Sequence, residues 1–180
     1  MGAFYDSLAA WAPRDAVVET VGKAYAAALV GPTRAGWTLV APDSDGRLDD
    51  ALSEAALALS AHGPVVCTTV HDDDDLLLQV YDAGRLVATY DSCPGYLGEG
   101  PTEPDLSEVD ALAAALGIAD VAPLRRVLAG RYDTETERLA AVAPLLGLPS
   151  YVVLFGYDYA VDGDLPPGLA QEDLQAVGSP

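Results

Sequence analysis

The stretch that decides the fold is TTVHDDDDLLLQVYDAGRLVATYDSCPGY, residues 68–96. Two runs rich in β-branched, aromatic and leucine residues, 76–82 and 85–91, are separated by a short segment of turn-forming residues. A third run of this kind, 64–71, precedes the four aspartates. Aspartate and glycine tolerate the backbone that tight turns need. The pattern therefore predicts a meander of three antiparallel strands over 64–91.

The second turn of this meander sets the register of its last two strands. Alanine resists positive φ, so a three-residue loop over 82–84 with Gly84 in the left-handed region is favoured over a two-residue turn. That loop sets Leu78 opposite Ala88 and gathers the apolar side chains on one face. The other face of the meander is then mixed in polarity, as expected for a partly solvated surface.

The first turn sets the place of the acidic residues. A turn centred on Asp73 and Asp74 pairs Asp72 with Asp75, and it puts His71 on the apolar face. Asp91 ends the third strand at the same end of the sheet as Asp72 and Asp75, on the mixed face. The register therefore predicts three neighbouring carboxylates at one corner of the sheet.

The remainder of the chain predicts mostly helices. Apolar residues recur at helical spacing, with glycine at or just after the end of most of these runs. The predicted helices are 15–30, 48–62, 105–117, 120–130 and 134–147, and two further strands are 36–42 and 151–159. Asp105, Asp120 and Thr134 are expected as N-caps. A loop and a short C-terminal helix that frays are expected over 160–180.

This order, with strands and helices partly segregated, favours the α+β class over a doubly wound parallel sheet. We expect a mostly antiparallel sheet of about five strands with helices packed on one face. The length of 180 residues suits a single globular domain, 1–180.

The composition narrows the class of partner. The chain carries 28 acidic and nine basic side chains, which gives a formal net charge of −19. Such a surface repels nucleic acids and anionic membranes, and it favours cations or a basic protein partner. The codon usage of a GC-rich genome, or adaptation to salt, would produce the same charge without any functional reason. These alternatives stay open, as does the oligomeric state.

The location is expected to be cytoplasmic. The chain has no apolar run near the length of a membrane span, and its first residues lack the features of a secretory leader. Its two cysteines, Cys67 and Cys93, make no disulfide framework and fit a reducing compartment.

The candidate metal ligands are Asp72, Asp75 and Asp91. Three carboxylates within reach of one another suit a hard divalent cation. A solvated hairpin end, where water screens the repulsion, is the simpler interpretation and the one that we favour. We therefore expect no resident cofactor, with a weakly bound divalent cation as the alternative.

The other candidate site residues are His71, Cys93, Tyr96 and Tyr132. His71 is a candidate base and Cys93 a candidate nucleophile, although the acidic neighbours of Cys93 raise the pKa of a thiol. Tyr96 and Tyr132 lie in predicted loops and are candidates for contact with a ligand or partner.

Three functions fit these observations. The first, which we favour, is a non-catalytic acidic binding protein that regulates or neutralises a basic protein partner, as immunity-type proteins do. It rests on the net charge and on the lack of a phosphate-binding loop or nucleophile-elbow motif. The second is a small metal-assisted hydrolase that uses the three aspartates and His71. The third is a protein that binds a small ligand near Tyr96.

Overall fold

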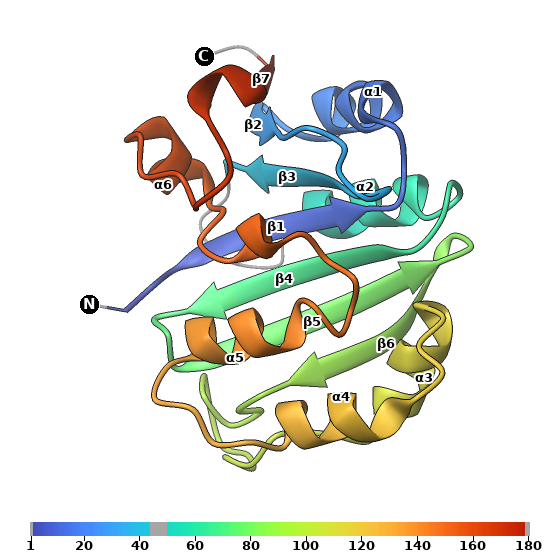
Figure 1. The fold of residues 1–180 in the computed structure, drawn as a ribbon, viewed down its shortest axis with the longest axis vertical. Coiled ribbons are helices and arrows are strands. Elements are labelled where there is room, and N and C mark those ends of the chain that lie inside the picture. Colours follow the sequence, from blue (N-terminus) through green and yellow to red (C-terminus); the bar gives the residue numbers. More distant parts are fainter. Residues whose placement is uncertain (1, 44–49, 179–180) are drawn as a thin grey trace.

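The computed structural model describes residues 2–43 and 50–178, and within them seven strands form one open antiparallel sheet (Figure 1). The strands are β1 (Tyr5–Ala10), β2 (Ala27–Val30), β3 (Thr38–Pro42), β4 (Val65–His71), β5 (Asp75–Asp82), β6 (Arg85–Asp91) and β7 (Gln175–Gly178). Their order is β6-β5-β4-β1-β3-β2-β7, so the predicted meander forms one side of the sheet. The α+β class is confirmed, whereas the described strands number seven rather than about five.

Helices cover both faces of the sheet, which corrects the expectation of a helical layer on one face (Figure 1). One face carries α1 (Arg14–Ala24) and α2 (Asp50–Leu59). The other carries α3 (Val109–Ala115), α4 (Val121–Leu128), α5 (Glu135–Val142), the 3₁₀ helix η1 (Ser150–Val152) and α6 (Tyr157–Val161). The reason lies in β1 and β4, whose consecutive side chains are buried on opposite faces. Strands of this kind need cover on both sides.

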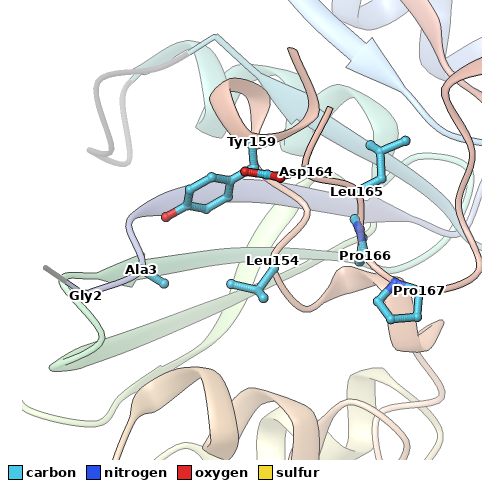
Figure 2. A pocket seen from close by; sticks show the side chains of 8 residues that line it. All are labelled: Gly2, Ala3, Leu154, Tyr159, Asp164, Leu165, Pro166 and Pro167. Atoms are coloured by element: carbon cyan, nitrogen blue, oxygen red, sulfur yellow. The ribbon is translucent and has the colours of Figure 1, made fainter. Parts of the chain in front are cut away.

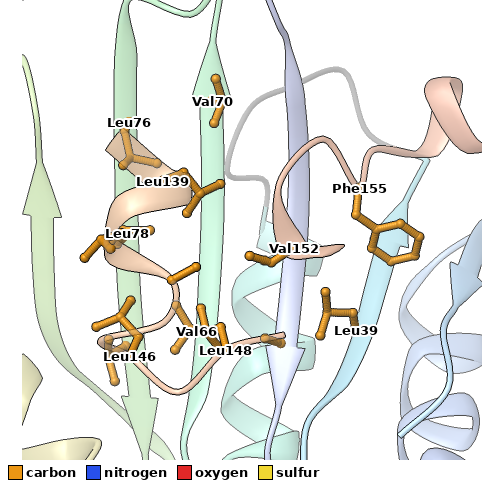
Figure 3. Packing of buried hydrophobic residues seen from close by; sticks show 14 of the residues in the cluster. Leu39, Val66, Val70, Leu76, Leu78, Leu139, Leu146, Leu148, Val152 and Phe155 are labelled. Atoms are coloured by element: carbon orange, nitrogen blue, oxygen red, sulfur yellow. The ribbon is translucent and has the colours of Figure 1, made fainter. Parts of the chain in front are cut away.

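The larger core lies between the sheet and α5 with the segment that follows it (Figure 3). Leu76 and Leu78 of β5 pack in the same cluster as Leu139 of α5, and all three side chains are fully buried. Val152 of η1 and Phe155 extend this core toward β3 (Figure 3). Burial of large side chains of this kind contributes roughly 1.5–3 kcal/mol each, so this core holds α5 firmly over the meander.

The sequence did not predict β1, β2 and β7, because apolar and polar residues do not alternate regularly along them. β1 contains Asp6 and Ser7 next to small alanines, and both polar residues are buried. β2 was assigned to the predicted helix 15–30, but α1 ends where Tyr25 adopts an extended backbone. The tail differs from the predicted short helix, since 171–173 form a 3₁₀ turn, η2, and β7 then pairs with β2.

The predicted strand 151–159 was wrong. This segment forms η1, then a residue in the left-handed region, Leu154 (φ 62°), and then α6. Phe155 is fully buried against the sheet rather than within it. A short continuous apolar run has the same pattern in a buried strand and in a segment that covers a sheet, so periodicity could not separate the two.

The predicted helices and caps are largely confirmed. Asp120 accepts a hydrogen bond from the amide of Ala122 at 3.2 Å and caps α4, and Thr134 caps α5. Asp105 is not the N-cap of α3, because that helix begins after Glu108. Residues 48 and 49 of the predicted helix 48–62 lie outside the described residues, and α2 matches the remainder as far as Leu59.

The turn between β5 and β6 contains only two residues, Ala83 and Gly84, both with positive φ (48° and 75°). The predicted three-residue loop was therefore wrong. A type I′ turn matches the twist of the strands, and alanine tolerates the left-handed region here. Leu78 pairs with Tyr90 rather than with Ala88, but a bulge in the ladder keeps all three side chains in the larger core.

The turn between β4 and β5 is centred one residue earlier than predicted. Asp72 and Asp73 both have positive φ (53° and 62°), and His71 pairs with Asp75 instead of Leu76. A shift of one residue moves every side chain of a strand to the other face. Val66 and Val70 of β4 belong to the larger core. The alternate residues, Cys67 and His71, therefore lie on the opposite face, which carries α1 and α2.

Asp73, expected at the tip of a solvated turn, joins three distant parts of the chain. Its amide donates to the carbonyl of Ala3 at 2.9 Å, and its Oδ2 accepts from the amide of Ala3 at 3.1 Å. Its carbonyl accepts from the amide of Glu135, and its Oδ1 accepts from the amide and hydroxyl of Thr136. Thr134 caps the next amide of α5. The hairpin thus satisfies amides that the helix itself leaves free.

Within the described ranges 2–43 and 50–178, no helix has the length and apolar character needed to cross a bilayer.

The substitution Asp73→Asn tests this joint. Asparagine keeps the left-handed backbone but removes the charge and one acceptor oxygen, so we expect the free energy of unfolding to fall by about 1–2 kcal/mol. The matched control is Asp72→Asn, an exposed neighbour in the same turn, for which we expect a change below about 0.5 kcal/mol. Urea denaturation at pH 7 measures both changes. Equal losses in the two variants would contradict this role of Asp73.

Candidate functional site

The candidate site is a polar surface at the end of the sheet where β4 turns into β5. We call it the acidic corner, and it consists of His71, Asp72, Asp74, Asp75, Asp91 and Tyr96. Asp72 and Asp74 are exposed, and the other four residues are half-buried. The buried cluster under α1 and α2 reaches Cys67 of β4 but does not include His71, two side chains further along the same face. His71 is half-buried at this end of the face, where its ring contacts Phe4 and Tyr96.

Asp75 and Asp91 form the centre of the acidic corner. Asp91 pairs with Leu77, which makes Asp75 its diagonal neighbour across the two strands. The two carboxyl groups are within hydrogen-bond reach of each other, and the hydroxyl of Ser92 donates to Asp75 Oδ1 at 3.2 Å. Burial, and then the charge of Asp91, raise the pKa of Asp75 to about 6. At neutral pH the pair therefore carries two opposed negative charges.

The described residues supply no close positive charge to balance this pair. Of the four ion pairs found within 2–43 and 50–178, none involves a carboxylate of the acidic corner. The sequence around it is also strongly acidic, since residues 71–110 contain eleven aspartates and glutamates, one arginine, Arg85, and no lysine. Hydrogen bonds from Ser92 and from the amide of Cys93 offset part of the repulsion at Asp75 and Asp91, but no ion pair among the described residues does so.

An aromatic row borders the carboxyl pair. The ring of His71 packs edge-on between Phe4 and Tyr96, with ring centroids 4.6 and 5.2 Å away. Desolvation, followed by the charges of Asp72 and Asp74, raises the pKa of the Tyr96 hydroxyl. Tyr96 is therefore a half-exposed aromatic ring in a strongly negative environment.

Cys93 lies next to the carboxyl pair, in surroundings that oppose a nucleophilic role. Its amide donates to Asp91 Oδ1 at 2.8 Å. Desolvation, followed by the charges of Asp75 and Asp91, raises the pKa of its thiol. Because the thiolate is the reactive form, a protonated thiol is a poor nucleophile at neutral pH.

The carboxylates of the acidic corner do not assemble into a set of metal ligands. Within the part of the chain that the structure describes, no group of three or more histidine, cysteine, aspartate or glutamate side chains is arranged to hold a metal ion. Asp75 and Asp91 are neighbours, although diagonal ones and not directly opposite as the predicted register required, and Asp72 lies in the turn and does not pair with Asp75. Binding of a divalent cation by the remaining pair stays a prediction.

Tyr132 belongs to a different part of the molecule. The guanidinium of Arg138 lies over its ring, 5.0 Å from the centroid. Arg138 is buried, forms an ion pair with Glu135 at 2.6 Å and donates to the carbonyls of Leu128 and Gly130. Tyr132 therefore helps to cover a buried network between α4 and α5.

Two residues of the site were not foreseen. Phe4 stacks on His71 because β1 lies beside β4, and β1 had not been predicted. Ser92 is buried, and its hydroxyl accepts from the amide of Leu76 at 2.8 Å while it donates to Asp75. In the sequence, the only indication of this role of Ser92 was that it directly follows Asp91.

No protein-family model, no curated protein and no solved structure matches this chain. The chemistry of the acidic corner is therefore inferred from its own residues.

The stability of the protein should depend on the ionisation of Asp75. Folding raises the pKa of this group, so the folded state binds the proton more tightly, and stability falls as pH rises from 3.8 toward about 6. Asp75→Asn keeps the shape and removes the charge. After allowance for solvent screening, we expect this variant to be about 1 kcal/mol more stable than the wild type at pH 7.

Urea denaturation at pH 4 and pH 7 measures this effect. The gain of Asp75→Asn should vanish at pH 4, where the wild-type Asp75 is protonated. The matched control is Asp74→Asn, which removes an exposed charge one residue away and should give less than half the gain at pH 7. A gain for Asp75→Asn that is the same at both pH values would rule out the ionised pair as its cause.

Proposed function

We propose that this chain is a non-catalytic binding protein, and that it holds a basic protein partner through the acidic corner. The observation that carries the proposal is the pair Asp75 and Asp91, two neighbouring carboxyl groups, where burial and then the charge of Asp91 raise the pKa of Asp75 to about 6. A cation placed between them relieves their repulsion and favours the ionised form of Asp75. The pair therefore favours a positively charged ligand most strongly at neutral pH.

The geometry suits arginine better than lysine. A guanidinium group is planar and offers five donors, so it can bind two neighbouring carboxylates at once. Its flat face also packs on aromatic rings, and Tyr96 provides a half-exposed ring at the same corner. An ammonium group lacks the planar fork and keeps its hydration more strongly. We therefore expect an arginine side chain of the partner to be the main contact.

The surrounding charge supports association over a longer range. Eleven of the 28 acidic residues lie between 71 and 110, and Asp72 and Asp74 extend into solvent beside the pair. A concentrated negative field raises the rate at which a basic partner arrives, while close contacts at the centre slow its release. This division of roles is that of an immunity-type protein, which neutralises a basic partner by covering it.

The proposal is tested with hexa-arginine and hexa-lysine peptides by isothermal titration calorimetry at physiological salt. We expect hexa-arginine to bind more tightly than hexa-lysine. In Asp75→Asn/Asp91→Asn its affinity should fall at least about tenfold, because hydrogen bonds to charged groups contribute roughly 1.5–3 kcal/mol each.

The matched control is Asp158→Asn/Asp162→Asn, which changes the net charge equally on and after α6, outside the acidic corner. This variant should lose less than about twofold in affinity, since distant exposed charges act only through a screened field. Equal losses in the two double variants would show that net charge alone attracts the peptide, and the proposed site would be wrong.

A further inference from the structure

A pocket of about 470 Å³ lies on another part of the molecule, between the N-terminal segment and the chain that follows α6 (Figure 2). Its walls include Ala3, Leu154, Tyr159, Asp164, Leu165 and Pro167. This volume lies within the range of roughly 300–1,000 Å³ that is usual for sites of small molecules. The pocket shares no residue with the acidic corner, so it requires a separate explanation.

Leu154 gives this pocket an unusual wall. Its backbone lies in the left-handed region (φ 62°), which leucine rarely adopts, and its side chain is 40 % exposed. The hydroxyl of Tyr5, a buried residue, accepts a hydrogen bond from the amide of Leu154 at 3.0 Å and holds it there. Strained backbone conformations cluster at binding and active sites. The exposed apolar side chain of Leu154 therefore fits a role in binding better than a role in stability.

The remaining walls are apolar with two polar groups. Figure 2 shows Leu154, Tyr159 and the stretch 165–167 around one space. The hydroxyl of Tyr159 accepts from the amide of Phe4 at 3.0 Å, so its own proton is directed elsewhere. The amide of Asp164 donates to the carbonyl of Tyr159 at 2.8 Å, which fixes the two residues relative to each other.

Asp164 is the one charged side chain among the described residues that line the pocket. No ion pair in the described ranges involves it. A mainly apolar pocket with a single carboxylate is complementary to a ligand that has an apolar body and a single positive charge. An anionic ligand would meet both this carboxylate and the strongly negative net charge of the chain.

We propose that this pocket binds a small apolar ammonium compound, such as an arylalkylamine. The ammonium group pairs with Asp164, and the apolar body packs against Leu154 and Leu165. The hydroxyl of Tyr159 donates to an acceptor on the ligand where one is present. This proposal is independent of the basic protein partner proposed for the acidic corner.

The test uses 2-phenylethylamine as the probe and 2-phenylethanol as its neutral counterpart, with binding measured by NMR titration on the full chain. We expect the amine to bind roughly tenfold more tightly than the alcohol, because it adds a charged hydrogen bond. In Asp164→Asn this preference should shrink to within about twofold, while binding of the alcohol stays unchanged. The matched control is Asp162→Asn, an exposed carboxylate outside the lining, which should keep the preference.

A second variant separates binding from folding. Leu154→Gly relieves the left-handed backbone, so the melting temperature should rise, but it removes an apolar wall, so the affinity for the amine should fall about fivefold. A merely structural residue would not raise stability and lower binding together. Equal binding of amine and alcohol by the wild type, or equal effects of Asp164→Asn and Asp162→Asn, would overturn the proposal.

Discussion

The hydrogen bonds of Asp73 connect the parts of this structure that the candidate site depends on. A residue at the tip of one hairpin binds the N-terminal segment and the first amides of α5. α5 in turn places Leu139 in the larger core, over the strands that carry the hairpin. The hairpin, the helix and the entry into β1 therefore support one another, and this hairpin leads into β5, the strand that begins with Asp75.

The same joint places the two proposed sites on either side of the N-terminal segment. Ala3 binds Asp73 and also lines the pocket of Leu154. The amide of Phe4 donates to the hydroxyl of Tyr159, while its ring packs on His71 of the acidic corner. Phe4 thus contacts residues of both surfaces, and Ala3 connects the pocket to Asp73, in the turn between Asp72 and Asp74.

The sequence predicted those parts of the fold whose pattern is local. The three strands of the meander, the caps at Asp120 and Thr134 and the neighbourhood of Asp75 and Asp91 follow from alternation, capping and turn chemistry. What could not be predicted depends on contacts far apart in the chain. The register of the first hairpin is set by which face of β4 meets α5, and the role of Asp73 is set by a helix more than sixty residues away.

The central claim is that Asp75 and Asp91 form an unbalanced carboxyl pair that a cationic partner relieves. Carbon-13 NMR titration of the two side-chain carboxyl groups, with and without hexa-arginine, tests this most directly. We predict a step near pH 6 for Asp75 in the free protein, and a shift of that step to lower pH when the peptide is bound. Titration of Asp75 near the ordinary value of about 4 in the free protein, or a step that the peptide leaves unchanged, would contradict the claim.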